Sequence, residues 1–213
     1  MEHNPIDTKR RIMDAAYAII EEQGFPALHI NDLVKRSRIS KKVIYDHFGS
    51  LEGLMLQLLE EQDSWTIPLP DDPVGDPAAQ IKVFFHRMTE ATRESIILRK
   101  FFEWELKAIC NMRARRVSAQ RKNRCLQALI PYAEQLQMDE KRLKDLWGMA
   151  YKLVNIPACI ISHAYDEEPD MEDEPDMEEV LEEKIDLLWQ NVMECLDKLL
   201  ASRLPNGKEE SKE

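Results

Sequence analysis

The sequence predicts an all-α protein, with an N-terminal three-helix helix-turn-helix domain followed by a larger helical domain. Apolar residues recur at helical spacing along most of the 213 residues, strand-like alternation is absent, and only 6 glycines are present. A proline-rich stretch, IPLPDDPVGDP, separates two bodies at residues 67–77. We therefore place the first domain at residues 1–50, with a connecting helix to about residue 65, and the second domain at residues 66–213.

The first four helices have recognisable start and stop residues. Asp7 or Thr8 is expected to cap the first helix and Gly24 to end it, and its apolar stripe is Ile12, Ala15, Ala16, Ile19 and Ile20. A short second helix carries Ile30, Leu33 and Val34. Ser40 is expected to cap a third helix with Ile44 and Phe48 on its buried face, and Ser50 to cap a fourth helix along Leu51, Leu54, Met55, Leu58 and Leu59.

The second domain is predicted to consist of long helices. Asp76 and Pro77 suit the N-cap and the first helical position, and the expected helices cover roughly residues 77–93, 95–109, 112–136, 139–165 and 177–203. Pro157 should kink the fourth of these. The last helix carries an apolar stripe of Leu181, Ile185, Leu188, Val192, Leu196 and Leu199.

Composition excludes several classes of protein. No apolar run of about 18 residues exists and the N-terminus lacks a signal-peptide core, so we expect a cytoplasmic protein that does not span a membrane. The 4 cysteines are far apart and suit thiols of a reducing compartment. Neither a nucleophile elbow nor a phosphate loop nor metal-ligand spacing occurs, so we expect no enzyme, no cofactor and no metal site.

The third helix is a candidate DNA reader. The formal net charge is −11, yet residues 1–50 hold 8 Lys/Arg and 7 Asp/Glu. In a helix-turn-helix the second short helix enters the major groove, and Ser40, Lys41, Lys42, Tyr45 and His47 suit phosphate and base contacts there. Asp46 could accept from a cytosine amino group or pair with Lys42. The alternative is an ordinary amphipathic helix with a solvated basic face.

Residues 8–59 resemble the DNA-binding domain of the TetR family of bacterial transcriptional regulators. The resemblance rests on six blocks, Ile12-Met13-Asp14-Ala15-Ala16, Gly24-Phe25, Ile30-Asn31-Asp32-Leu33, Ile39-Ser40, Tyr45-Asp46-His47-Phe48 and Ser50-Leu51-Glu52-Gly53-Leu54. His29 stands at the family's usual Ser/Thr cap and Val43 at a common threonine, and both join the candidate DNA-contacting set. Departures are Arg38 and Lys42 at usual glycines, and Leu51 at a frequent lysine.

The resemblance implies a sequence-specific transcriptional regulator, expected to be a repressor released by a small, largely apolar effector. It implies an effector cavity among the later helices, for which our candidates are Met88, Trp104, Trp147 and Tyr151. It also implies a homodimer, paired through the last two helices, that binds a pseudo-palindromic operator in double-stranded DNA. The alternative is a helical interaction protein that keeps this fold but acts through a protein partner.

Two charged segments have no assigned role. Ten of the 14 residues at 166–179 are acidic, around a tandem repeat, and suit a solvated loop or, alternatively, a Ca²⁺ site. A basic run at 113–124 contains Arg113, Arg115, Arg116, Arg121, Lys122 and Arg124. It could be a solvated face, a second DNA contact, the mouth of an anionic effector site, or a face balanced by the acidic loop.

Overall fold

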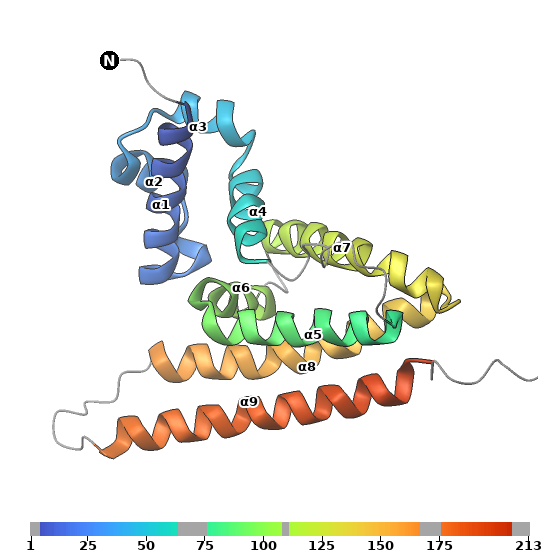
Figure 1. Ribbon diagram of the computed structural model, residues 1–213. Helices are drawn as coiled ribbons and strands as arrows, with labels where there is room; N and C mark the ends of the chain where they lie inside the picture. Colours follow the sequence, from blue (N-terminus) through green and yellow to red (C-terminus); the bar gives the residue numbers. More distant parts are fainter. Residues whose placement is uncertain (1–4, 64–75, 108–110, 167–175, 206–213) are drawn as a thin grey trace, which may run out of the picture. The chain divides into compact units, whose positions relative to one another are not determined.

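The computed structural model describes residues 5–63, 76–107, 111–166 and 176–205 (Figure 1). All regular secondary structure in these ranges is helical, which confirms the predicted fold class. The chain divides into two compact units, one made of residues 1–62 and 95–122, the other of residues 63–94 and 123–213. Within the described residues, no helix is long and apolar enough to cross a bilayer.

The first unit begins with five helical segments. These are α1 (Pro5–Gln23), the 3₁₀ helix η1 (Phe25–Ala27), α2 (Ile30–Ser37), α3 (Lys41–Phe48) and α4 (Leu51–Gln62). The expected cap of α1 at Asp7 or Thr8 is wrong, because α1 already begins at Pro5 and both residues lie inside it. Proline suits a first helical position, where its fixed φ is favourable and no N–H is needed.

The ends of α1 and the starts of α3 and α4 follow the sequence pattern. Gly24, at φ 77°, donates its N–H to the Ile20 carbonyl and ends α1. Ser40 Oγ accepts from the Val43 N–H at 3.4 Å, and Ser50 Oγ accepts from the Gly53 N–H at 2.9 Å. Both serines are therefore the predicted N-caps.

Helix α6 (Ile96–Leu106) and residues 112–122 of α7 (Met112–Gln135) complete the first unit. Helix α1 packs against α2, α4 and α6, and η1 packs against α6. The Phe25 ring stacks on Trp104, with centroids 5.2 Å apart and planes 11° apart, and meets Phe101 edge-on at 5.6 Å. The 3₁₀ helix η1, which the sequence pattern does not predict, thus supplies a central side chain of this core.

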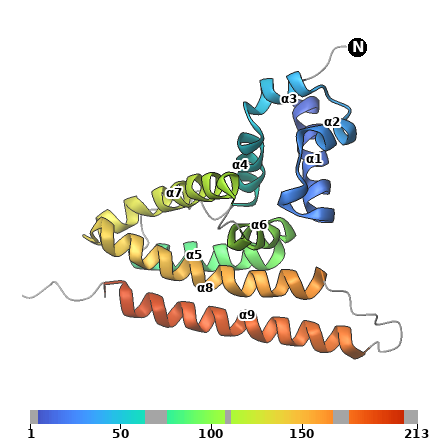
Figure 2. The ribbon, with the colours of Figure 1, turned by 180° about the vertical axis from the view of Figure 1, so that it is seen from behind.

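The second unit contains α5 (Pro77–Glu94), the rest of α7, α8 (Glu140–Asp166) and α9 (Asp176–Arg203). Figures 1 and 2 show α8 and α9 antiparallel and side by side, and α5 packs against both. An aromatic cluster fills the space between α5 and α8, with neighbouring ring centroids 5.3–6.1 Å apart. Its members are Phe84, Phe85, Trp147 and Tyr151.

The apolar stripe of α9 differs from the predicted one. Val192 and Leu196 are buried as expected, but Ile185, Leu188 and Leu199 are only half-buried, and the side chain of Leu181 lies outside the described part. The buried line instead continues through Trp189 and Leu200. The predicted stripe contains only aliphatic residues and omits Trp189. Because an indole has more apolar surface to bury than a leucine side chain, Trp189 occupies the inner face.

Candidate nucleic-acid interface

Helix α3 is held in a fixed orientation by two buried anchors. Ile44 is 2% exposed and Phe48 is 6% exposed, four residues apart on the inner face of the helix. The Ser40 cap defines its first turn, and Gly49, at φ 70°, ends it by donating its N–H to the Tyr45 carbonyl. An eight-residue helix with both ends defined and one face buried presents its other face rigidly.

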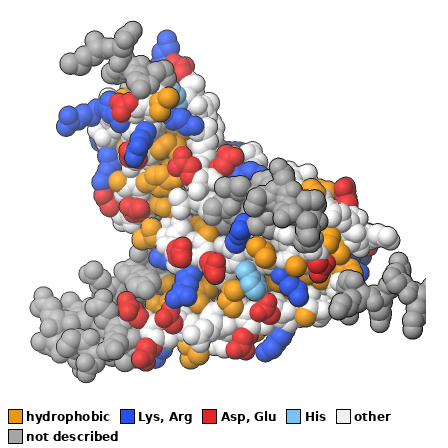
Figure 3. Space-filling view, in the orientation of Figure 1, with side chains coloured by type: hydrophobic (Ala, Val, Ile, Leu, Met, Phe, Trp, Pro, Cys, Tyr) orange, Lys and Arg blue, Asp and Glu red, His pale blue; other side chains and the backbone are white. Residues whose placement is uncertain are grey.

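The opposite face of α3 is open to solvent and positively charged. Lys41, Lys42 and Tyr45 are exposed, while Val43 and His47 are half-buried. Lys41 Nζ lies 5.9 Å from the centre of the Tyr45 ring, a cation–π contact that leaves the ammonium accessible. Figure 3 shows Lys and Arg side chains on the surface of the region formed by α1–α3.

Asp46 is exposed and makes no ion pair with Lys42 among the described residues. The cytosine-accepting alternative for this carboxylate therefore stays open, whereas the restraint of Lys42 by Asp46 is absent here. His29 is also exposed, at the N-cap of α2 with extended backbone (φ −115°), and its side chain makes no capping hydrogen bond.

The turn between α2 and α3 is tightly bonded. Ser37 Oγ donates to the Leu33 carbonyl at 2.6 Å and accepts from the Ile39 N–H at 3.2 Å. Arg11 Nη2 donates to the Ser37 carbonyl at 2.9 Å, which ties this turn to α1. Arg38, between them, has φ 58° and ψ 29°, so the left-handed conformation expected at a glycine position is adopted by arginine.

The phenol of Tyr17 on α1 is hydrogen-bonded to α4. Tyr17 Oη donates to Glu61 Oε2 at 2.8 Å and lies 3.3 Å from both the Leu58 carbonyl oxygen and Gln62 Nε2. Burial, together with the nearby Glu61 carboxylate, raises the pKa of Tyr17 well above its ordinary value. The phenol therefore stays protonated and remains a donor between the two helices.

Most of the described basic run at 113–124 is paired inside the protein. Arg116 Nη2 lies 2.8 Å from Glu52 Oε1 and Arg113 Nε lies 3.5 Å from the same oxygen, so two residues of α7 meet the first turn of α4. The Arg116 hydrogen bond is the main reason that the pKa of Glu52 is lowered. Sequence reasoning did not find Glu52, because nothing in the sequence near residue 52 indicates its distant partners.

Three further members of the run are also engaged. Lys122 pairs with Glu105 on α6, and the buried Arg121 guanidinium lies 5.1 Å from the ring centres of both Phe101 and Phe102. In the second unit, Arg124 Nη2 lies 2.6 Å from the carboxylate of the buried Asp63. Part of the acidic segment 166–179 lies outside the described residues, so neither of its interpretations is tested.

The four candidate effector residues are all buried. Met88, Trp147 and Tyr151 belong to the second unit, where the Trp147 and Tyr151 ring centres are 5.3 Å apart. Trp104 belongs to the first unit and stacks on Phe25 instead. Within the part of the chain that the structure describes, no cluster of three metal-ligating side chains occurs.

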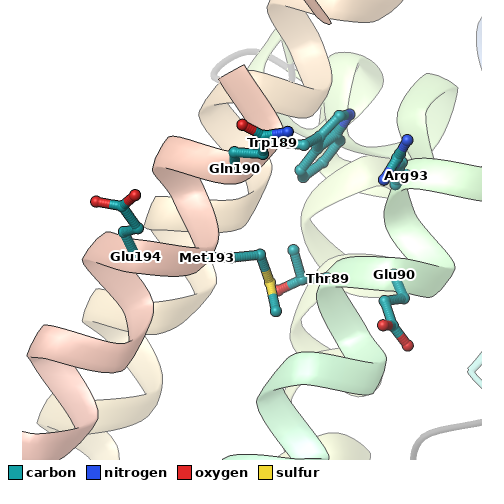
Figure 4. Close-up of a pocket in the computed structure, with 7 residues that line it drawn as sticks. All are labelled: Thr89, Glu90, Arg93, Trp189, Gln190, Met193 and Glu194. Carbon is teal, nitrogen blue, oxygen red and sulfur yellow. The ribbon is translucent and has the colours of Figure 1, made fainter. Parts of the chain in front are cut away.

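A pocket of about 430 Å³ lies elsewhere in the second unit, between α5 and α9 (Figure 4). Thr89 and Trp189 form its buried floor, and Met193 points across it from α9 toward Thr89. Its charged rim consists of Glu90, Arg93 and Glu194, with Gln190 beside them. None of the four candidate effector residues lines this pocket.

Helices α2 and α3 and the tight turn between them form a helix-turn-helix, and the exposed face of α3 is basic. Residues 12–58 match the family model for bacterial regulatory proteins of the tetR family. The A-factor receptor protein of Streptomyces griseus is 30% identical over 59 residues, which are 28% of this chain and 21% of that protein. The matched region, residues 12–58, is therefore similar to the DNA-binding domain of bacterial regulatory proteins of the tetR family.

Solved structures share the fold along nearly the whole chain. Salmonella enterica GusR is 18% identical, with 94% of this chain and 98% of that chain covered and a TM-score of 0.58. Thermus thermophilus FadR, a TetR-family transcriptional repressor in complex with lauroyl-CoA, is 19% identical, with coverage of 96% and 99% and a TM-score of 0.56. At these identities the likeness establishes the fold only.

Proposed function

We propose that this protein is a cytoplasmic homodimeric repressor that binds a pseudo-palindromic operator through α3 and is released by a small effector. The observation that carries the proposal is the division of α3 into two faces. Ile44 and Phe48 are buried, while Lys41, Lys42 and Tyr45 face solvent beside a capped helix N-terminus. Such a face offers hydrogen-bond donors and positive charge to phosphates and base edges.

Each helix-turn-helix is proposed to contribute a small cationic patch within an acidic protein of net charge −11. With about four phosphates neutralised per protomer, the logarithm of the affinity should fall with the logarithm of salt concentration at a slope near −7. The acidic remainder of the chain disfavours non-specific contact with DNA, which raises the specificity ratio.

Dimerisation through α8 and α9 is supported by apolar side chains that this chain leaves uncovered. Ile156 and Ile160 on α8 are 51% and 58% exposed, and Leu187 on α9 is 57% exposed. A second copy that covers both helices would bury these residues in a four-helix arrangement. Two recognition helices one helical turn apart, about 34 Å, would then meet two half-sites.

We propose that the effector is largely apolar and binds in the second unit. The Trp147–Tyr151 cluster supplies aromatic surface there, and the pocket between α5 and α9 is within the size range of small-molecule sites. The effector can release DNA only if its affinity differs between the DNA-bound and free arrangements. A thermal-shift screen of apolar compounds, followed by DNA titration, tests this part.

The central experiment is selection of bound duplexes from a random pool by the purified protein. We expect a palindromic winner, which would establish function, symmetry and half-site spacing together. Lys42→Glu should abolish binding while circular dichroism stays unchanged, and Lys82→Glu, a matched charge reversal at an exposed residue of α5, should retain binding. No enrichment, or wild-type affinity in Lys42→Glu, would contradict the proposal and favour action through a protein partner.

A further inference from the structure

We infer that Arg38 is an additional DNA-contacting residue, whose guanidinium binds a phosphate of the duplex beside the N-terminus of α3. This inference rests on the proposed function, and it assigns a contact to the turn of the helix-turn-helix rather than to the recognition helix. Three features of the structure carry it: the backbone conformation of Arg38, the rigidity of the turn, and a guanidinium that has no partner in the described part of the chain.

The backbone of Arg38 adopts a conformation that disfavours its side chain. Its φ of 58° places it in the left-handed region, where the Cβ atom crowds a carbonyl oxygen and glycine is preferred. The fold explains this conformation, since the Arg38 N–H donates to the Val34 carbonyl at 2.9 Å and so ends α2. The fold does not explain why an arginine occupies the position.

The turn cannot relax to remove this strain. Ser37 and Ile39, on either side of Arg38, are each only 4% exposed. The Ser37 hydroxyl bonds to both Leu33 and Ile39, and Arg11 holds the Ser37 carbonyl. With both neighbours buried and bonded, the left-handed residue between them is fixed, and its side chain projects outward.

The Arg38 side chain has no partner among the residues that the structure describes. It is exposed, and it makes no ion pair and no side-chain hydrogen bond with any residue that the structure describes. Arg36, two residues earlier, shows the contrast, because its guanidinium pairs with Glu22 of α1, with Nη1 2.6 Å from Oε2. A strained residue with an unused charge is typical of a functional position rather than of a structural one.

The place of Arg38 in the chain indicates a phosphate as its ligand. It precedes the Ser40 cap by two residues, so its charge adds to Lys41, Lys42 and the positive end of the α3 dipole. Residues of the first turn of a recognition helix meet base edges, whereas the turn before that helix lies at the edge of the groove, where the phosphates are. The planar guanidinium fork can bond two phosphate oxygens at once.

The test is Arg38→Gly, assayed on a duplex that the wild-type protein selects from a random pool and on an unrelated duplex, over a range of KCl concentrations. Loss of one phosphate contact per protomer should reduce the salt slope of the dimer by about 1.8 and the affinity at 0.1 M salt by about 60-fold. The fold loss of affinity should be the same for the selected duplex and for the unrelated duplex. Because glycine relieves the strain, the Tm should rise by about 2–4 °C.

Gln137→Gly is the matched control for the backbone. Gln137 is the other non-glycine residue with positive φ (53°) in the described ranges, and it is exposed in the turn between α7 and α8. This variant should raise the Tm in the same way and leave DNA affinity unchanged. Arg38→Lys should keep most of the salt slope, and Lys82→Gln, which removes an exposed charge of α5, should keep all of it.

Wild-type affinity and salt slope in Arg38→Gly would overturn the inference and leave the proposed function intact. A loss confined to one base pair of the selected duplex would also overturn it, because that result would make Arg38 a base reader. A wild-type protein that enriches no duplex would overturn the proposed function and this inference together, so the two failures are distinguishable.

Discussion

Replacing Glu52 with glutamine removes the carboxylate charge that holds two arginines of α7 at the start of α4. Glu52 Oε1 lies 2.8 Å from Arg116 Nη2 and 3.5 Å from Arg113 Nε. The side chain of Glu52 is 25% exposed, and those of Arg113 and Arg116 are 39% and 57% exposed. The cluster is therefore partly screened by water, and its energy lies near that of surface ion pairs.

An exposed ion pair contributes roughly 0.2–1 kcal/mol, far below the Coulomb energy of two charges in a dry interior. Two arginines share one carboxylate here, and glutamine keeps the ability to accept a hydrogen bond. We therefore expect Glu52→Gln to lower the free energy of unfolding by about 1 kcal/mol at pH 7. For a chain of this length the Tm should fall by about 2–4 °C.

The effect should depend on pH in a defined direction. The hydrogen bond from Arg116 is the first cause of the lowered pKa of Glu52 in the folded protein. A carboxyl group with a lowered folded-state pKa contributes its full stability above the unfolded-state pKa of about 4.3. The contribution is lost as the pH falls through the folded-state value. The difference between wild type and Glu52→Gln should thus be constant above about pH 6 and shrink toward pH 3.

Urea unfolding followed by circular dichroism at pH 7 and at pH 3.5 measures both effects. Glu21→Gln is the matched control, because Glu21 is an exposed carboxylate of α1 with no ion pair among the described residues. Equal stabilities of the two variants at pH 7 would refute the role of Glu52. A difference that persists unchanged in acid would refute its electrostatic origin.

Three other substitutions test the local geometry around α3 and the core of the first unit by urea unfolding. Gly53→Ala would bring a Cβ against the Phe48 carbonyl oxygen, so it should lower the free energy of unfolding by about 1–3 kcal/mol and weaken DNA binding. Gly148→Ala is the control, because a Cβ there would meet nothing within 4 Å, and it should raise the free energy of unfolding by up to about 1 kcal/mol. Ser50→Ala removes the cap of α4 and should cost about 1 kcal/mol, most of which Ser50→Asp restores. Phe25→Ala should cost about 3–5 kcal/mol and Phe25→Leu clearly less, so equal losses would contradict the ring-stacking account.

Much of the fold follows from local patterns that a single sequence displays. Helix α3 was predictable because Ser40, Ile44, Phe48 and Gly49 specify a cap, two anchors four residues apart, and a stop. Each of these features acts within one or two turns of the chain. The N-caps of α4 and α5 were predictable for the same reason, and Asp76 Oδ1 does accept from the Ala78 N–H at 3.1 Å.

The features that sequence reasoning missed depend on contacts between distant segments. The basic run at 113–124 shows no preference for Glu52, Glu105 or Asp63 until the helices pack. The 3₁₀ turn that carries Phe25 is too short to have a period, so its place in the core is decided by α6. The choice of the buried face of α9 is another such feature, because the large side chain of Trp189 lies on that face.

The ion pairs of the first unit also decide which cations can contribute to DNA binding. The salt slope counts the counterions that are released from a duplex when the protein binds. A lysine or arginine that is already paired with a carboxylate must first lose that partner before it can bind a phosphate. Pairing in the first unit occupies Arg36, Arg113, Arg116 and Lys122. Lys41 and Lys42 pair with no carboxylate in the described part of the chain. A salt slope near −7 in the wild type that falls in Lys42 variants, but not in Arg116→Gln, would therefore place the DNA-binding charge on α3 rather than on the larger basic run of α7.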